Sequence, residues 1–176
     1  MKRISGLFII ALITFVMTNA SFAQTPKLND AEIASVAVTA NQIDIDYAKI
    51  AMLKSKNEQV LTFAKTMAAD HQAVIDQAVA LVTKLKVTPQ DNEVSKKLNA
   101  DAEATRKTLK AKSAIDFDKA YVDNEVAYHK AVISAVETLL IPQVQNAELK
   151  ALLQKVLPTL KSHLEHAEMV QKSLSK

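Results

Sequence analysis

Apolar residues recur every three or four positions along four long stretches of the chain, a spacing that places them on one face of an α-helix. This pattern predicts four long helices, over residues 29–55, 57–86, 116–141 and 146–173. Residues 92–112 show the same spacing more weakly, with a thin apolar face on an otherwise charged surface, and predict a shorter helix. The chain is therefore expected to be all-α.

The connections between these helices indicate how they are arranged. Pro26 precedes the first helix, Pro89 follows the second, and Pro142 lies in the last connection, before which we expect the third long helix to end. Two connections are short, whereas the one after the second helix is about 30 residues long and contains the weaker helix. A helix of about 20 residues spans about 30 Å, enough to return the chain to the other end of a bundle. The sequence thus predicts an all-α, ferritin-like four-helix bundle with a helical crossover between the second and third long helices.

The first 23 residues have the pattern of a secretory signal peptide. "MKR" is a cationic start, "LFIIALITFVM" is an apolar run, and "SFA" is a small-residue cleavage site before Gln24. The apolar run is shorter than the about 20 residues that span a bilayer, and the chain has no cysteine for lipid attachment. We therefore expect residues 1–23 to be a cleaved signal peptide, and residues 24–176 to form a single ferritin-like helical bundle domain that is soluble and periplasmic.

Charge gives no indication of a nucleic-acid partner. The whole chain has 22 basic and 19 acidic residues; Lys2 and Arg3 belong to the predicted signal, so 20 and 19 remain, a net charge of +1. Basic and acidic residues are interspersed, as on a solvated surface. We expect no transmembrane segment in the mature chain. The helix over residues 92–112 either covers the bundle, as such segments more often do, or docks a protein partner in the cell envelope.

The composition excludes several kinds of site. Because the chain has no cysteine, it has no disulfides, no thiolate metal ligands and no cysteine nucleophile. Its one glycine, Gly6, lies in the predicted signal, so residues 24–176 contain no Gly-rich phosphate loop, dinucleotide fingerprint or nucleophile elbow. We therefore expect a protein that is not an enzyme.

Histidine stands at an apolar position in three of the predicted helices. His71, His129 and His163 continue the three- and four-residue spacing of their helices, where an apolar side chain is expected. At 1.5 Å per residue, His71, His129 and Asp44 fall at one level near the middle of the bundle, with His163 one to two turns lower. Glu125, four residues before His129, is within reach of that histidine.

These five residues admit two interpretations. Imidazole and carboxylate ligands suit a divalent transition metal such as zinc, copper, iron or manganese, so that His71, His129, Asp44, Glu125 and His163 are candidate metal ligands. Alternatively, the histidines form a buried polar network, each hydrogen-bonded to a carboxylate or carbonyl group, which fixes the register of the helices. The sequence alone favours the network. A di-iron oxidase is disfavoured, because such sites need Glu-x-x-His pairs and the chain contains none.

Two neighbouring polar residues are expected to have lesser roles. His166 forms an i, i+3 pair with His163 that could hold a metal at the helix surface, but a solvated side chain is the simpler interpretation. Asp70 is turned about 100° around the helix from His71, so we expect it to face solvent or to cap a neighbouring group.

Three segments resemble one known family. "FAKTMAADH" is similar to the F-A-x-x-M-x-x-D-H segment of domain of unknown function family 4142, a group of exported, ferritin-like bacterial proteins often labelled predicted outer membrane proteins. "FDKAY" followed by His129 resembles its F-D-x-x-Y and later histidine, and "LPTLKSHLEHA" resembles its L-P-x-x-x-x-H-L-x-x-A ending. The family usually has a glutamate where this chain has Asp44, so the carboxylate is kept and shortened by one methylene. The resemblance implies the bundle fold and export, but no biochemical activity.

Overall fold

The computed structural model describes residues 26–175, in which the chain forms five long helices. The predicted signal peptide over residues 1–23, with its cleavage site before Gln24, lies outside the described residues. The long helices are α1 (Asp30–Lys54), α2 (Glu58–Leu85), α3 (Glu93–Ala111), α4 (Ala114–Ala135) and α6 (Ala147–Leu174). These bounds confirm the five predicted helices to within two residues, apart from the C-terminal end of α4.

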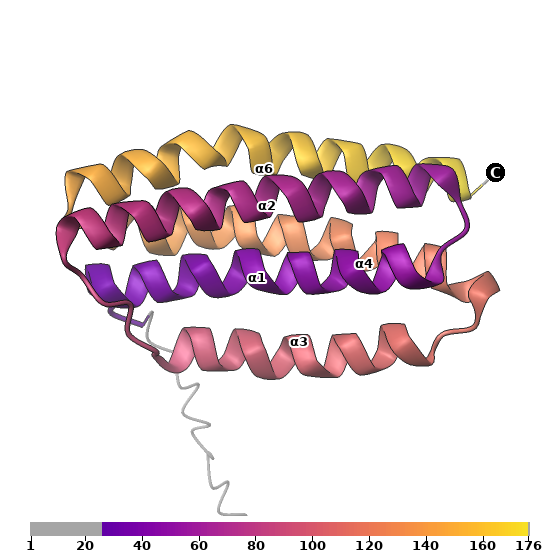
Figure 1. The fold of residues 1–176 in the computed structure, drawn as a ribbon, viewed down its shortest axis with the longest axis horizontal. Coiled ribbons are helices and arrows are strands. Elements are labelled where there is room, and N and C mark those ends of the chain that lie inside the picture. Colours follow the sequence, from indigo (N-terminus) through magenta and orange to yellow (C-terminus); the bar gives the residue numbers. More distant parts are fainter. Residues whose placement is uncertain (1–25, 176) are drawn as a thin grey trace, which may run out of the picture.

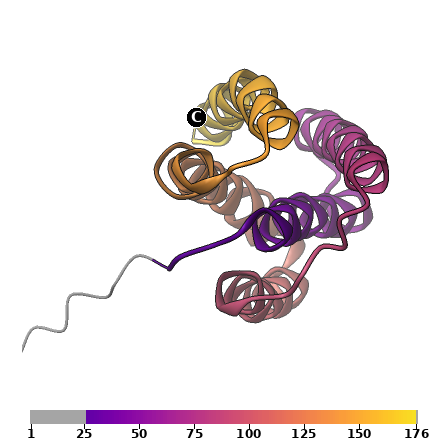
Figure 2. The ribbon, with the colours of Figure 1, turned by 90° about the vertical axis from the view of Figure 1, so that its left-hand side faces the viewer.

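Four of these helices form a bundle, and the fifth lies outside it. Viewed from one end, α1, α2, α4 and α6 occupy four corners, and α3 lies against the outer side of α1 (Figure 2). Viewed from the side, α1 and α2 run in opposite directions, α3 carries the chain back along the bundle, and α4 then runs parallel to α2 (Figure 1). The chain therefore has the predicted all-α bundle with a helical crossover between its second and third long helices.

Polar side chains fix where the helices begin. The Asn29 side chain accepts a hydrogen bond from the Glu32 amide at 3.0 Å, and the Glu32 carboxylate accepts one from the Asn29 amide at 2.9 Å, which together form a capping box. Asn57, Asn92 and Asn146 likewise accept hydrogen bonds from amides in the first turns of α2, α3 and α6. Because the first amides of a helix lack partners within the helix, these asparagines stabilise each start by about 1 kcal/mol.

The end of α4 differs from the prediction. We expected this helix to end before Pro142, but the helical backbone continues through a π-helical segment, η1 (Val136–Leu140), and a short helix, α5 (Ile141–Gln143). In η1 the Ile141 amide donates to the Val136 carbonyl, five residues earlier. The hydrogen-bond pattern thus changes directly before Pro142, which stands in the first turn of α5, where a missing N–H is tolerated.

Two apolar clusters fill the bundle on either side of its middle. One contains the fully buried side chains of Phe63, Met67 and Tyr121, and the other contains Ile33 and Leu153. Each large apolar side chain that is buried contributes about 1.5–3 kcal/mol, so these clusters hold the four helices together. In the described part of the chain, no helix combines the length and the hydrophobicity that crossing a membrane requires.

Helix α3 packs against α1 and buries few of its side chains. Its buried apolar residues are Ala102 and Leu109, and Arg106 forms an ion pair with Asp46 of α1 at 3.4 Å. This placement agrees with a helix that covers one side of α1, while the envelope partner remains a prediction.

We expect the amides of α3 to exchange with solvent faster than those of α2 and α6. Three side chains are buried along α3, whereas seven are buried along α2 and six along α6. Segments that bury few apolar side chains open at a lower free energy than the global unfolding. Hydrogen exchange followed by mass spectrometry measures this difference. Protection in α3 equal to that in α2 and α6 would show instead that α3 unfolds only together with the bundle.

Candidate metal centre

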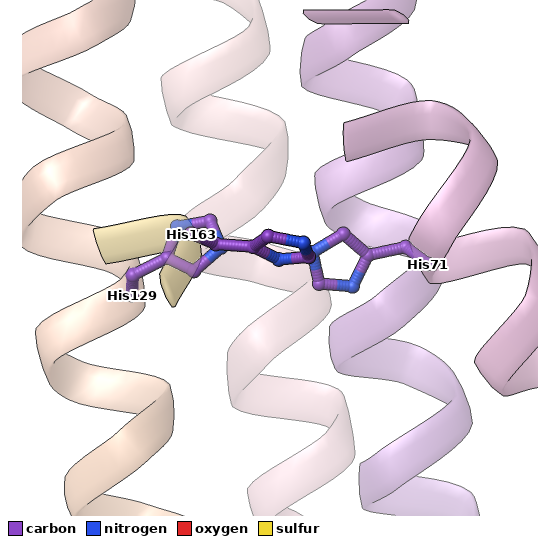
Figure 3. Close-up of side chains that lie close together, drawn as sticks. All are labelled: His71, His129 and His163. Carbon is purple, nitrogen blue, oxygen red and sulfur yellow. The ribbon is translucent and has the colours of Figure 1, made fainter. Parts of the chain in front are cut away.

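Three histidine rings from three helices meet in the middle of the bundle. Figure 3 shows His71 of α2, His129 of α4 and His163 of α6 pointing toward one another. The ring centroids are 5.7 Å apart for His71 and His129, 5.2 Å for His71 and His163, and 5.6 Å for His129 and His163. One ligand nitrogen of each ring lies within 4.8 Å of the other two. We call these three residues the histidine trio.

The position of His163 corrects the estimate made from the sequence. Counting residues from the turns placed it one to two turns below the other two histidines, but its ring centroid lies 5.2 and 5.6 Å from theirs. The count assumed that the preceding helix ends before Pro142. The start of α6 is instead set by η1 and α5, which extend the preceding helical segment to Gln143.

All five candidate ligands are removed from solvent. The exposed fraction is 0 % for Asp44 and Glu125, 1 % for His129, 4 % for His71 and 6 % for His163. A buried polar group without a partner costs about 1–3 kcal/mol, so the hydrogen bonds of each group decide what the site can do.

The proton of His71 is fixed by an asparagine. Asn41 donates its amide N–H to the Ala37 carbonyl at 2.8 Å, so its Oδ1 atom is the one that faces His71, with Nδ1 2.7 Å away. Because an amide oxygen only accepts hydrogen bonds, His71 Nδ1 carries the proton. Its other nitrogen, Nε2, is therefore unprotonated in the neutral ring.

The other two histidines are oriented in the same manner. His129 Nδ1 lies 3.0 Å from the Glu125 backbone carbonyl, and His163 Nε2 lies 2.9 Å from the Asp70 carboxylate. Both partners only accept hydrogen bonds, so these two nitrogens are the donors. The unprotonated nitrogens are then His129 Nε2 and His163 Nδ1.

The trio therefore has three buried, unprotonated nitrogens within one cluster of rings. His71 Nε2, His129 Nε2 and His163 Nδ1 are buried and have no hydrogen-bond partner among the described residues. Three acceptors that face one another without a donor are an unfavourable arrangement for a polar network. The same arrangement suits a cation, because a metal-bound histidine usually donates its second N–H to a carboxylate or carbonyl oxygen.

Asp44 of α1 lies beside the trio. Its Oδ2 atom is 3.2 Å from His71 Nε2 and 3.5 Å from His129 Nε2, without the geometry of a hydrogen bond. Two ligand atoms of a tetrahedral zinc ion, each 2.0–2.2 Å from the metal, are about 3.4 Å apart, so these distances match the edge of such a site. Burial raises the pKa of Asp44 to about 8, so the carboxyl group is mostly protonated at pH 7 unless a cation displaces the proton.

Glu125 forms a second group with Asp44 and His129, whose ligand atoms also lie within 4.8 Å of one another. Its Oε2 atom is 3.7 Å from His129 Nδ1, so the predicted contact between these two residues is present. Burial, followed by the charge of the nearby Asp44, holds the pKa of Glu125 well above its usual range. Glu125 therefore lies next to the trio, four residues before His129 on α4, but it is not a member of the trio.

The same burial keeps the histidines neutral. It lowers the pKa of His71 to about 3 and that of His129 to about 4, and it also lowers the pKa of His163. Neutral imidazole is the form that binds metal ions. The trio is therefore in its ligand form at pH 7 without any change of protonation.

A cavity of about 350 Å³ adjoins the trio. Aliphatic side chains of the five long helices line most of it, while Asp44 and the three histidines contribute polar atoms. The cavity is therefore a mainly apolar space that has the polar atoms of the trio and of Asp44 in its lining.

Two residues that orient the histidines were not predicted as part of the site. Asn41 precedes Asp44 by three residues and was not singled out, although that spacing places both on one side of a helix. Asp70 was expected to face solvent or to cap a neighbour, and its contact with His163 bears out the second alternative. His166 lies outside both groups of ligand atoms in the described chain, with its ring edge-on to Phe63 at a centroid distance of 5.1 Å.

Comparison with known proteins places most of the chain in one family. The family model described as Domain of unknown function (DUF4142) matches residues 17–170, which include four of the long helices entirely and most of α6. Comparison with curated proteins and with solved structures gave no match.

Proposed function

This chain belongs to the family of domains of unknown function numbered 4142, and from that premise we propose that it binds one divalent transition-metal ion, with zinc as the best fit, at the histidine trio. The observation that carries the proposal is the set of three buried imidazole lone pairs, from three helices, that meet without a donor among them. A metal ion satisfies all three at once.

The polar network that the sequence favoured explains this arrangement less well. Within the cluster, the groups able to donate a hydrogen bond to the trio are the protonated forms of Asp44 and Glu125, and Asp44 lies close to two of the three nitrogens. Each carboxyl proton bonds to one acceptor at a time, so at least one buried lone pair of the trio would stay unpaired. Each unpaired group costs about 1–3 kcal/mol, whereas each histidine already has a partner that orients it for a metal.

The ligand set suits zinc. His71, His129 and His163 would supply three nitrogens, and Asp44 is placed to supply an oxygen. Imidazole nitrogen and carboxylate oxygen are both ligands of tetrahedral zinc, and copper also binds imidazole well. The ion would displace the Asp44 proton, so the positive charge would be partly balanced by a carboxylate in contact with it.

We further propose that the protein acts in the periplasm and that its role is metal binding without catalytic turnover. Residues 1–23 carry the signal-peptide pattern, which supports export. All three residues of the trio offer imidazole nitrogens, whereas di-iron oxidases use several bridging glutamates and Glu-x-x-His pairs. A protein of this kind would hold metal ions in the envelope, as part of handling metal or oxidative stress.

A zinc titration with a competing chelator tests the proposal. We expect one zinc ion per chain, and we expect Asp70→Asn to weaken the affinity about 10- to 100-fold, because the loss of a partner that orients a ligand has effects of this size. The amide that replaces Asp70 can no longer provide the charge that holds the His163 N–H.

Asp76→Asn is the matched control for this titration. Asp76 lies on the same helix, is exposed and accepts a hydrogen bond from Gln72, so its replacement should leave zinc affinity unchanged. A stoichiometry far below one ion per chain, for both zinc and copper, would contradict the proposal. Equal losses of affinity in the two variants would show that Asp70 has no special role.

A further inference from the structure

We propose that the cavity beside the histidine trio binds a medium-chain fatty acid, with the hydrocarbon chain among the aliphatic side chains and the carboxylate at the metal centre. The size and the lining of the cavity support the location of the hydrocarbon chain. The position of the carboxylate rests on the proposed metal function.

The cavity has the size and the surface of a ligand site. Its volume of about 350 Å³ lies within the range of roughly 300–1,000 Å³ that small-molecule sites have. At about 30 Å³ for each water-sized group, it holds on the order of a dozen non-hydrogen atoms. That is the size of a fatty acid with about ten carbon atoms.

The shape of the cavity follows from small side chains on two facing helices. Ala34 and Ala37 line it on α1, and Ala131 and Ala135 line it on α4. From Ala34 to Asp44 the lining extends about 15 Å along the helix at 1.5 Å per residue. An elongated space lined by alanine, valine and leucine side chains suits an unbranched aliphatic chain.

The buried polar side chains in the cavity lining are those of the trio and Asp44. His71, His129 and Asp44 are each more than nine-tenths buried, and each has a side-chain atom without a hydrogen-bond partner among the described residues. A long aliphatic molecule would therefore place its polar end at these side chains and its chain beyond them.

A carboxylate is the head group that fits the metal-loaded site. Zinc binds oxygen ligands and accepts a fifth ligand beside four others, so a carboxylate can coordinate next to Asp44. An ionised carboxylate in a buried site requires a compensating charge, and the metal ion supplies it. The zinc-free protein would thus bind the same acid far more weakly.

Isothermal titration calorimetry with decanoic acid tests this inference on zinc-loaded and zinc-free protein. We expect one decanoate per zinc-loaded chain, with at least tenfold weaker binding to the zinc-free protein and at least tenfold weaker binding of butanoate. Ala78→Leu places a larger side chain at a buried position of the cavity lining. It should weaken decanoate binding at least tenfold and change zinc affinity less than twofold.

Ala73→Leu, the same substitution on the exposed side of α2, is the matched control and should bind decanoate like the wild type. Ala78→Val gives the same test with a smaller side chain if the leucine variant does not fold. Undiminished decanoate binding in the folded cavity variant, or equal affinity for butanoate and decanoate, would overturn the inference.

Failure of the metal proposal can be told apart from failure of the cavity proposal. If neither zinc nor copper binds, the proposed function and the position of the carboxylate are both wrong. The zinc-free protein then tests the cavity alone. A cavity that binds the hydrocarbon chain must bind decan-1-ol more tightly than butan-1-ol. The absence of that preference would refute the cavity as the site of the chain.

Discussion

Zinc should raise the melting temperature of the wild-type protein by about 5–10 °C at a hundredfold excess over its dissociation constant. By mass action, a ligand at this excess that binds only the folded state adds about 2.7 kcal/mol to the free energy of unfolding. In a domain of about 150 residues each kcal/mol shifts the melting temperature by about 2–4 °C. In His71→Leu, which removes one nitrogen of the trio, the zinc-dependent rise should be lost or strongly reduced.

The comparison within each variant isolates the metal effect. His71→Leu also leaves the Asn41 Oδ1 atom without its donor, so its melting temperature without zinc can differ from that of the wild type. The quantity to compare is therefore the shift between chelator and zinc. His166→Leu removes a histidine of α6 that lies outside the trio, and it should keep the full shift. A shift of equal size in wild type and His71→Leu would exclude the trio as the site.

The contribution of the Asp44 carboxyl group to the stability of the zinc-free protein should decrease with rising pH. Burial raises its folded-state pKa to about 8 from an ordinary value of 3.8. Below the unfolded pKa both states are protonated, and the stability linked to this group is fully present. Above it the unfolded state loses the proton while the folded state keeps it, so stability declines until the pH passes about 8.

Asp44→Asn isolates this contribution. Relative to the variant, the wild type should lose about 1.4 kcal/mol of unfolding free energy per pH unit between pH 5 and pH 8. Urea unfolding of both proteins in chelator at several pH values measures the difference. Zinc should oppose the decline in the wild type, because the ion takes the place of the Asp44 proton and binds more tightly as pH rises. A difference that does not vary with pH would mean that Asp44 is already ionised in the folded zinc-free protein.

The helices and their connections could be predicted from the sequence because both depend on local rules. The three- and four-residue spacing of apolar side chains marks a buried helix face, and Asn29, Asn57 and Asn146 satisfy amides that every helix start exposes. The length of the connection after α2 was sufficient to predict the crossover. Pro142 was misread because a proline usually ends a helix, whereas the π-helical hydrogen bonds of η1 accommodate it.

Part of the candidate site was also visible in the sequence. An imidazole at an apolar position on each of three helix faces identified His71, His129 and His163, and counting along the helices brought His71, His129 and Asp44 to one level. The level of His163 was misplaced by one to two turns, because helix starts and tilts depend on packing between helices and not on the spacing within one helix.

The chemistry of the site was decided only by the tertiary structure. A sequence does not show which nitrogen of a histidine carries the proton, since that depends on a partner that lies 30 residues away for His71 and Asn41 and 93 residues away for His163 and Asp70. Those partners leave unprotonated nitrogens within one cluster of rings, and this favours a metal ion over the network that the sequence suggested. Composition and periodicity thus determined the bundle and the depth of its histidines. Contacts between distant segments determined the protonated nitrogens of His71 and His163, the raised pKa of Asp44 and the cavity beside them.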